Sequence, residues 1–162
     1  MIQLFITGGT IDKQYDACSG ELTFPETHIP ELLLEANCTL PVSIEILMQK
    51  DSLQMNAQDR ADIEQACLLS ESKYIVITHG TDTMVDSAKV LQLNPSLNSK
   101  TIVITGAMRP FKLGQSDGSF NLGSALMAAQ LAPNGVWIAM NGQLFSADQV
   151  IKNRSIGQFE AT

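Results

Sequence analysis

Short apolar runs alternate along the chain with segments in which apolar positions recur at helical spacing. The runs predict strands near Ile2–Thr7, Val42–Met48, Tyr74–Thr78, Thr101–Thr105 and Val136–Met140. The segments between them predict helices near Ile29–Glu35, Ala57–Ser70, Met84–Leu91 and Phe120–Leu131. Strands composed almost entirely of Val and Ile are covered on both faces, as in a parallel sheet. The pattern therefore predicts an α/β fold with a mainly parallel sheet.

Two longer segments lack this pattern and are predicted to be functional loops. Residues Ile11–Thr27 follow the first strand, and Met108–Ser119 follow the fourth. From Asn141 onward, polar residues predict a short hairpin or tail. With 162 residues and 44% hydrophobic content, residues 1–162 are expected to form one domain with a substantial core.

Charge and composition exclude several classes of protein. The net charge is −7 and no basic stripe is present, which argues against nucleic-acid binding. No apolar run is long enough to span a bilayer, and the N-terminus lacks a signal-peptide pattern, so a cytoplasmic protein without membrane contact is expected. The three cysteines form no metal-binding spacing and are interpreted as reduced structural thiols, with a catalytic cysteine as the weaker alternative.

Threonine-glycine turns follow two of the predicted strands. The first is TGGT at Thr7–Thr10, and the second is THGTDT at Thr78–Thr83. Ligands of open α/β sheets bind beyond the carboxyl ends of the strands. The two turns therefore predict one shared site.

The side chains of these turns could carry hydrolytic chemistry. Thr10 and Thr81 offer hydroxyls, and Asp82 offers a carboxylate at a helix start. A threonine hydroxyl needs a base to become a nucleophile, and Lys100 is the candidate. Taken singly, each threonine is more often a helix cap and Lys100 an ordinary solvated residue. Because the turns lack the spacings of dinucleotide and phosphate-binding loops, no nucleotide cofactor is predicted.

Four ordered motifs resemble the N-terminal domain of the bacterial-type L-asparaginase (asparaginase/glutaminase) family. They are ITGGTI at Ile6–Ile11, ITHGTDTM at Ile77–Met84, GAMRP at Gly106–Pro110 and SDGSFNL at Ser116–Leu122. The resemblance implies a flavodoxin-like (Rossmann-like) three-layer domain with an unusual left-handed crossover. It also implies an amidohydrolase that releases ammonia and uses neither a metal nor a cofactor.

The resemblance also implies catalytic roles for four residues. Thr10 would be the nucleophile that attacks the amide carbon and forms an acyl-enzyme. Thr81, Asp82 and Lys100 would form a second, supporting triad, because Lys100 stands six residues before Gly106.

The substrate-binding residues follow from the same motifs. Ser52 would contact the substrate carboxylate, and Asp82 would hold its ammonium group. Backbone groups of Gly9, Gly80 and Thr81 would bind substrate or developing negative charge. The expected ligands are asparagine, aspartate or glutamine.

Three departures from the family leave the activity open. The chain is expected to lack the family's C-terminal domain, which predicts a homodimer or higher homo-oligomer that completes the site. The family's loop tyrosine is missing from its usual place, so Tyr15 is the candidate loop activator, with an exposed loop aromatic as the plainer interpretation. Leu53 stands where many members have a polar residue. An active amidohydrolase, a weak or inactive amino-acid-binding or regulatory module, and a partner-binding interaction protein all remain open.

Overall fold

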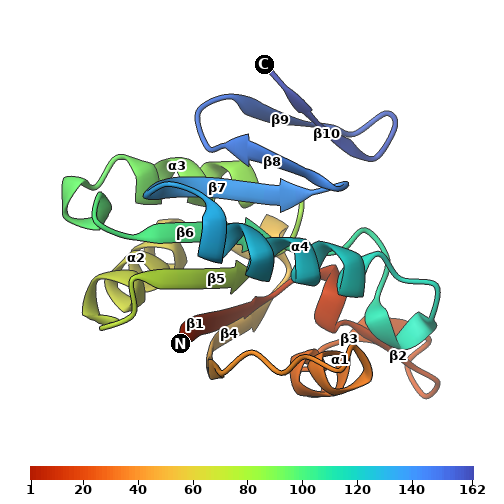
Figure 1. Ribbon diagram of the computed structural model, residues 1–162. Helices are drawn as coiled ribbons and strands as arrows, with labels where there is room; N and C mark the ends of the chain where they lie inside the picture. The colour runs from red at the N-terminus through yellow and green to blue at the C-terminus, as the bar shows by residue number, and fades with distance from the viewer.

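The apolar runs form the parallel part of a six-stranded sheet in the computed structural model, which describes residues 1–162 (Figure 1). Five strands are parallel, and the last, β8, runs antiparallel to β7. In spatial order they are β4 (Val42–Lys50), β1 (Ile2–Gly8), β5 (Tyr74–Thr78), β6 (Thr101–Thr105), β7 (Gly135–Met140) and β8 (Gln143–Ser146). The prediction of a mainly parallel α/β sheet is confirmed.

Four helices cover the two faces of the sheet and make three layers. Helices α1 (Ile29–Glu35) and α4 (Gly118–Leu131) pack on one face, and α2 (Ala57–Leu69) and α3 (Met84–Gln92) pack on the other. The alternation of side chains along β1 supplies both cores, because Leu4 and Ile6 join the α1–α4 cluster whereas Phe5 joins the α2–α3 cluster. All four helices start and end close to their predicted positions.

Two successive crossovers have opposite hands. The β5–α3–β6 and β6–α4–β7 connections step in the same direction across the sheet, yet α3 and α4 lie on opposite faces. One of the two must therefore be left-handed, which connection rules do not predict. This agrees with the left-handed crossover that the family resemblance implies.

Local capping explains where the longest helix of the α2–α3 face begins. The Asn56 side chain accepts a hydrogen bond from the Asp59 backbone N–H, and the Asp59 side chain accepts one from the Asn56 N–H. This reciprocal pair satisfies two of the free donors at the start of α2. None of the helices is long and apolar enough to cross a membrane.

Two small antiparallel hairpins lie outside the main sheet. The first, β2 (Gln14–Asp16) with β3 (Glu21–Thr23), occupies the predicted loop after β1. The second, β9 (Val150–Asn153) with β10 (Gln158–Ala161), follows β8 and lies beside it at the edge of the sheet (Figure 1). Short 3-10 turns complete the structure at η1 (Thr10–Asp12), η2 (Ser52–Gln54), η3 (Pro95–Leu97) and η4 (Phe111–Leu113).

Candidate active site

The two predicted turns touch each other. Gly9 has φ +82°, and a Cβ atom on it would run into the backbone of Gly80. The Gly9 N–H also donates to the Lys50 carbonyl at the end of β4, at 2.9 Å. The ends of β1, β4 and β5 therefore converge, and glycine allows an approach that a side chain would prevent.

Thr10 opens the 3-10 turn η1 directly after this contact. Thr10 is partly exposed, and its hydroxyl makes no hydrogen bond within the chain. Both backbone groups of Gly9 are already occupied, because its carbonyl accepts from the Asp12 N–H at 3.1 Å. The Gly9 backbone is thus committed to holding the turn, while the Thr10 hydroxyl is available to a ligand.

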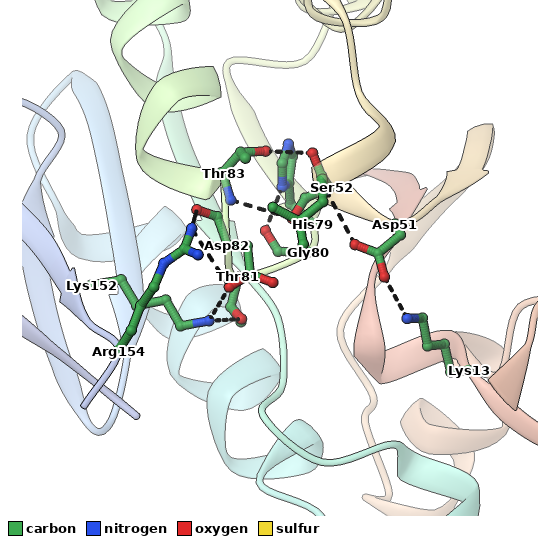
Figure 2. A network of polar contacts seen from close by, with 11 residues as sticks. Lys13, Asp51, Ser52, His79, Gly80, Thr81, Asp82, Thr83, Lys152 and Arg154 are labelled. Atoms are coloured by element: carbon green, nitrogen blue, oxygen red, sulfur yellow. Dashed lines mark hydrogen bonds and ion pairs between the residues drawn. The ribbon is translucent and has the colours of Figure 1, made fainter. Parts of the chain in front are cut away.

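A lysine from the β9–β10 hairpin joins the second turn (Figure 2). Lys152 Nζ donates to Thr81 Oγ1 and to Asp82 Oδ1, both at 2.8 Å. The Lys152 side chain is only 10% exposed and that of Asp82 is 32% exposed. Burial weakens the competition of water for these groups, so the three side chains form an ordered unit.

Lys100 lies elsewhere, and its predicted place beside Thr81 and Asp82 is wrong. Its Nζ donates to the carbonyl oxygens of Ser70 and Ser72, which precede β5. Lys100 immediately precedes β6, so it lies at the amino ends of the parallel strands. The two turns lie at the carboxyl ends, and Lys152 occupies the position beside them.

Arg154 adds a second cation on the same side of Asp82. Its Nη2 donates to the Asp82 carbonyl oxygen at 3.2 Å and lies 3.8 Å from Asp82 Oδ1. Its side chain is 62% exposed. Figure 2 shows Lys152 and Arg154 reaching Asp82 from the same hairpin.

Ser52 fixes the second turn from the opposite side. Its hydroxyl oxygen accepts from the Thr83 N–H at 3.3 Å, and its carbonyl accepts from the Thr83 hydroxyl at 2.8 Å. Gly80 packs so closely on Ser52 that a Cβ atom there would collide with the serine side chain. The Ser52 hydroxyl keeps its own proton to donate, so its contact with a substrate carboxylate stays a prediction.

A buried histidine supports the same turn through a contact with the Gly80 carbonyl. His79 Nδ1 lies 2.8 Å from the Gly80 carbonyl, and Nε2 lies 2.8 Å from the Ser87 hydroxyl. Because a carbonyl can only accept, Nδ1 carries the proton and Nε2 accepts from Ser87. Burial lowers the pKa of His79 to about 4, so the ring is neutral and holds the turn as a fixed brace.

An ion pair ties the first turn to the Ser52 turn. Lys13 Nζ lies 2.5 Å from Asp51 Oδ2, and the same carboxylate accepts the Leu53 N–H at 3.1 Å. The Lys13 ammonium also lies 5.7 Å from the centre of the Phe24 ring. The hydrogen bond from Lys13 holds the pKa of Asp51 below its usual value.

Two further candidates have no contact with the reacting groups. Tyr15 is half-exposed on the β2–β3 hairpin, and its hydroxyl makes no hydrogen bond to Thr10, so its activating role stays a prediction. Cys67 is buried in the core, and burial raises its thiol pKa to about 12. This thiol stays protonated, which argues against a cysteine nucleophile there.

The backbone adds donors between the two turns. The N–H groups of Thr81 and Asp82 make no hydrogen bond within the chain. Together with the ammonium of Lys152, they can stabilise negative charge that develops on a substrate oxygen. The arrangement suits nucleophilic attack on a polarised carbonyl.

Sequence reasoning missed the part played by the β9–β10 hairpin. Residues after Asn141 were expected to form a hairpin or tail, without a role in the site. The signal was the pair of cations at Lys152 and Arg154, in a segment that contains few other charges. A cation at the same ends of the strands stabilises the charged form of an acid such as Asp82.

Comparisons with known proteins identify the family of the chain. The family model described as "Asparaginase, N-terminal" matches residues 1–160. The glutaminase-asparaginase of Acinetobacter glutaminasificans is 30% identical over 171 residues, covering 96% of this chain and 50% of that protein.

Solved structures of two asparaginases share the fold of this chain. The thermostable L-asparaginase from Thermococcus kodakarensis superposes with a TM-score of 0.84 at 25% identity, covering 99% of this chain and 50% of that one. The probable cytoplasmic L-asparaginase from Campylobacter jejuni has a TM-score of 0.84 at 30% identity, covering 99% and 52%. The chain spans about half the length of the curated relatives it matches.

Proposed function

This chain belongs to the asparaginase family, because it matches the family's N-terminal domain, and on that premise we propose an amidohydrolase site where the Gly9 and Gly80 turns meet. The proposed reaction hydrolyses the side-chain amide of asparagine or a related small amide, such as glutamine, and releases ammonia. The observation that carries the proposal is the Gly9–Gly80 contact, which brings the turn with the free Thr10 hydroxyl against the turn with the Thr81–Asp82–Lys152 unit.

In the proposed reaction, Thr10 Oγ1 forms a bond to the amide carbon and gives up its proton. The amide C–N bond then breaks, and the nitrogen takes up the proton that Thr10 gave up and leaves as ammonia. Water cleaves the resulting ester, which yields the carboxylate product and restores the Thr10 hydroxyl. The Thr81 and Asp82 N–H groups would bind the negative charge that builds on the carbonyl oxygen.

Thr81, Asp82 and Lys152 are proposed as the supporting triad. The 2.8 Å distances from Lys152 Nζ to Thr81 Oγ1 and to Asp82 Oδ1 support a proton path between the lysine and the Thr81 hydroxyl. Ser52 and the Gly80–Asp82 turn are proposed to bind substrate. The free oxygen of Asp82, Oδ2, makes no hydrogen bond within the chain and can receive a substrate donor.

A binding module with little turnover is the second candidate. No side chain of the chain accepts the Thr10 proton, and Tyr15 makes no contact with it. The site would then hold asparagine or aspartate without hydrolysing it. A second copy of the chain, in a homodimer or larger homo-oligomer, is the proposed source of groups that would complete a catalytic site.

The proposed setting is the cytoplasm. The Campylobacter jejuni protein is described as a probable cytoplasmic asparaginase, whereas a relative from Haemophilus influenzae is described as periplasmic. Fractionation of cells that express the native gene tests this part of the proposal.

Ammonia release from asparagine and glutamine tests the activity. Thr10→Ala is expected to lower the rate to background, a loss of about 10³-fold or more. Lys152→Met is expected to lower kcat strongly. Lys100→Met is the matched control, because it removes the same charged side chain at the opposite end of the sheet and is expected to leave kcat unchanged.

Circular dichroism must show that all three variants are folded. Equal rates for the wild type and Thr10→Ala at high enzyme concentration would remove the catalytic proposal and leave the binding module. A loss of kcat in Lys100→Met equal to that in Lys152→Met would remove the proposed triad.

A further inference from the structure

One edge of the main sheet is open. Strand β4 pairs only with β1, whereas the strand at the opposite edge, β8, has the β9–β10 hairpin beside it (Figure 1). β4 is also the longest strand of the sheet, with nine residues from Val42 to Lys50. An edge strand of this length presents a row of unpaired backbone donors and acceptors to any chain that can pair with it.

Three alternate residues of β4 direct their backbone groups away from the sheet. The Pro41 carbonyl accepts the Ile2 N–H at 3.2 Å, so it points toward β1. Because backbone groups alternate between the two sides of a strand, those of Ser43 and Glu45 also point toward β1. The outward N–H and C=O groups are those of Val42, Ile44 and Ile46.

Two of these residues also expose apolar side chains. Ile44 is opposite Leu4 and Ile46 is opposite Ile6, so both isoleucine side chains lie on the α1–α4 face of the sheet. Ile44 is 37% exposed and Ile46 is 53% exposed. Branched apolar side chains beside unpaired backbone groups favour another strand as the occupant of this edge.

The segment Val42–Ile46 carries little protection against such pairing. Natural proteins protect edge strands with lysines, prolines and bulges. Pro41 stands just before the segment, and the register shift of β4 against β1 comes just after it. Its single charged residue, Glu45, points to the opposite face from the two isoleucines, because side chains alternate along a strand.

The segment is complementary to a second copy of itself. In an antiparallel pair centred on Ile44, this residue lies opposite the partner's Ile44, and Val42 lies opposite the partner's Ile46. All the outward backbone groups are then bonded, and the apolar side chains form one row on the α1–α4 face. On the other face Ser43 lies opposite the partner's Glu45, so its hydroxyl can donate to that carboxylate.

Two features of the strand select this register over its neighbours. A pair centred on Glu45 would place two carboxylates directly opposite each other, which is unfavourable. A pair centred on Ile46 would place Ile44 opposite the partner's Met48, beyond the start of the register shift. Met48 packs against the α2–α3 core instead of the α1–α4 face, so it cannot extend the apolar row.

We propose that the β4 edge is a homodimer interface, in which the Val42–Ile46 segments of two copies pair antiparallel about a two-fold axis at Ile44. The two sheets then become one continuous sheet, and the closed symmetry leaves no free β4 edge. Because the paired strands run in opposite directions, the carboxyl ends of the two sheets face apart, and this interface adds no group to either candidate active site. The inference therefore does not depend on the proposed amidohydrolase function.

The mass in solution tests the dimer. A strand pair of this length is small for an interface, so a Kd in the micromolar range is expected. Sedimentation velocity over about 1–500 μM protein should show the mass rising from one chain to two. Salt at about 0.15 M screens the repulsion between two chains of net charge −7. The mass of one chain throughout this range would overturn the proposal.

Edge variants test which surface pairs. Ile44→Lys places two like charges opposite each other and is expected to raise Kd about 100-fold or more. Ile44→Pro removes the outward N–H without removing a bond to β1, and it is expected to raise Kd about tenfold. Leu131→Lys is the matched control, because Leu131 is 76% exposed at the end of α4, away from β4.

Leu131→Lys is expected to keep the wild-type Kd, and kcat of Ile44→Lys is expected to stay unchanged. Thermal melting checks that each variant is folded. A wild-type Kd in both Ile44 variants would overturn the proposal, whatever the outcome of the ammonia assay.

Cysteine crosslinking tests the register. In a Cys18→Ser, Cys38→Ser background, Ile44→Cys places two thiols opposite each other with about 5.5 Å between Cα atoms, within the range of a disulfide. Ile46→Cys is the control, because the two-fold axis separates its two copies by about 13 Å along the strands. Mild oxidation is expected to give a covalent dimer from Ile44→Cys alone. Crosslinking of Ile46→Cys without that of Ile44→Cys would overturn the proposed pairing.

Discussion

Replacing Gly9 with alanine tests whether contact between the two turns holds the site together. Gly9 has φ +82° and ψ 176°, a backbone region that is almost exclusive to glycine. Forcing alanine into it costs about 1–3 kcal/mol of folding free energy. The new Cβ would also press on the Gly80 backbone, which cannot rotate away as a side chain could.

Gly114 separates these two effects, because its φ of +69° and ψ of 169° lie in the same region. A Cβ atom on Gly114 would have no atom within 4 Å. Gly114→Ala therefore measures the backbone strain alone. The extra destabilisation in Gly9→Ala is expected to be about 1–3 kcal/mol, the usual cost of overpacking.

Thermal and urea unfolding of both variants measure the difference. For a chain of this size, 1 kcal/mol corresponds to about 2–4 °C, so Gly9→Ala is expected to melt about 2–12 °C below Gly114→Ala. Its residual kcat is expected to fall about 100-fold, because a displacement of about 1 Å at a catalytic group has an effect of that size. Equal unfolding free energies for the two variants would refute the idea that the turns are in close contact.

Two further predictions concern the supports of the site. The free energy of unfolding is expected to fall as pH drops from about 6.5 towards 4, because folded His79 keeps a pKa of about 4 while His79 in the unfolded chain takes up a proton. The loss reaches about 3 kcal/mol. Urea unfolding at a series of pH values should show a flatter dependence over this range for His79→Gln. A double-mutant cycle of Lys13→Met and Asp51→Asn is expected to give a coupling of about 1 kcal/mol in the free energy of unfolding, and both variants are expected to raise KM. The more exposed Lys112–Glu31 pair should couple by less than about 0.5 kcal/mol. A coupling in the surface pair equal to that of Lys13 and Asp51 would contradict the second prediction.

Most of the fold could be predicted because it depends on local patterns. The apolar runs that become β1, β5 and β6 are buried on both faces, and such runs are hard to mistake. The start of α2 is encoded by Asn56 and Asp59 within four residues. The convergence of the Gly9 and Gly80 turns follows from parallel strands, whose carboxyl ends share one edge.

The lysine of the site could not be found from spacing. Lys152 meets Asp82 across 70 residues of sequence, through a hairpin whose docking depends on tertiary packing. The direction of the predicted strands was nevertheless enough to exclude Lys100, because a residue just before β6 lies at the amino ends. The role of Ser52 as a clamp on Thr83 also depends on a contact between distant loops, which composition does not reveal.

The site is complete only while the β9–β10 hairpin is docked, and the hairpin opens and closes locally without unfolding of the sheet. It is anchored by Val150 and Phe159 in the core and by the Phe159 N–H bond to Asn141. If its local opening costs about 2 kcal/mol, about 3% of folded molecules at any moment lack Lys152 and Arg154 in place. A ligand that binds at the site beside Lys152 must then also slow amide exchange in this hairpin, because ligand affinity and hairpin docking are reciprocally linked.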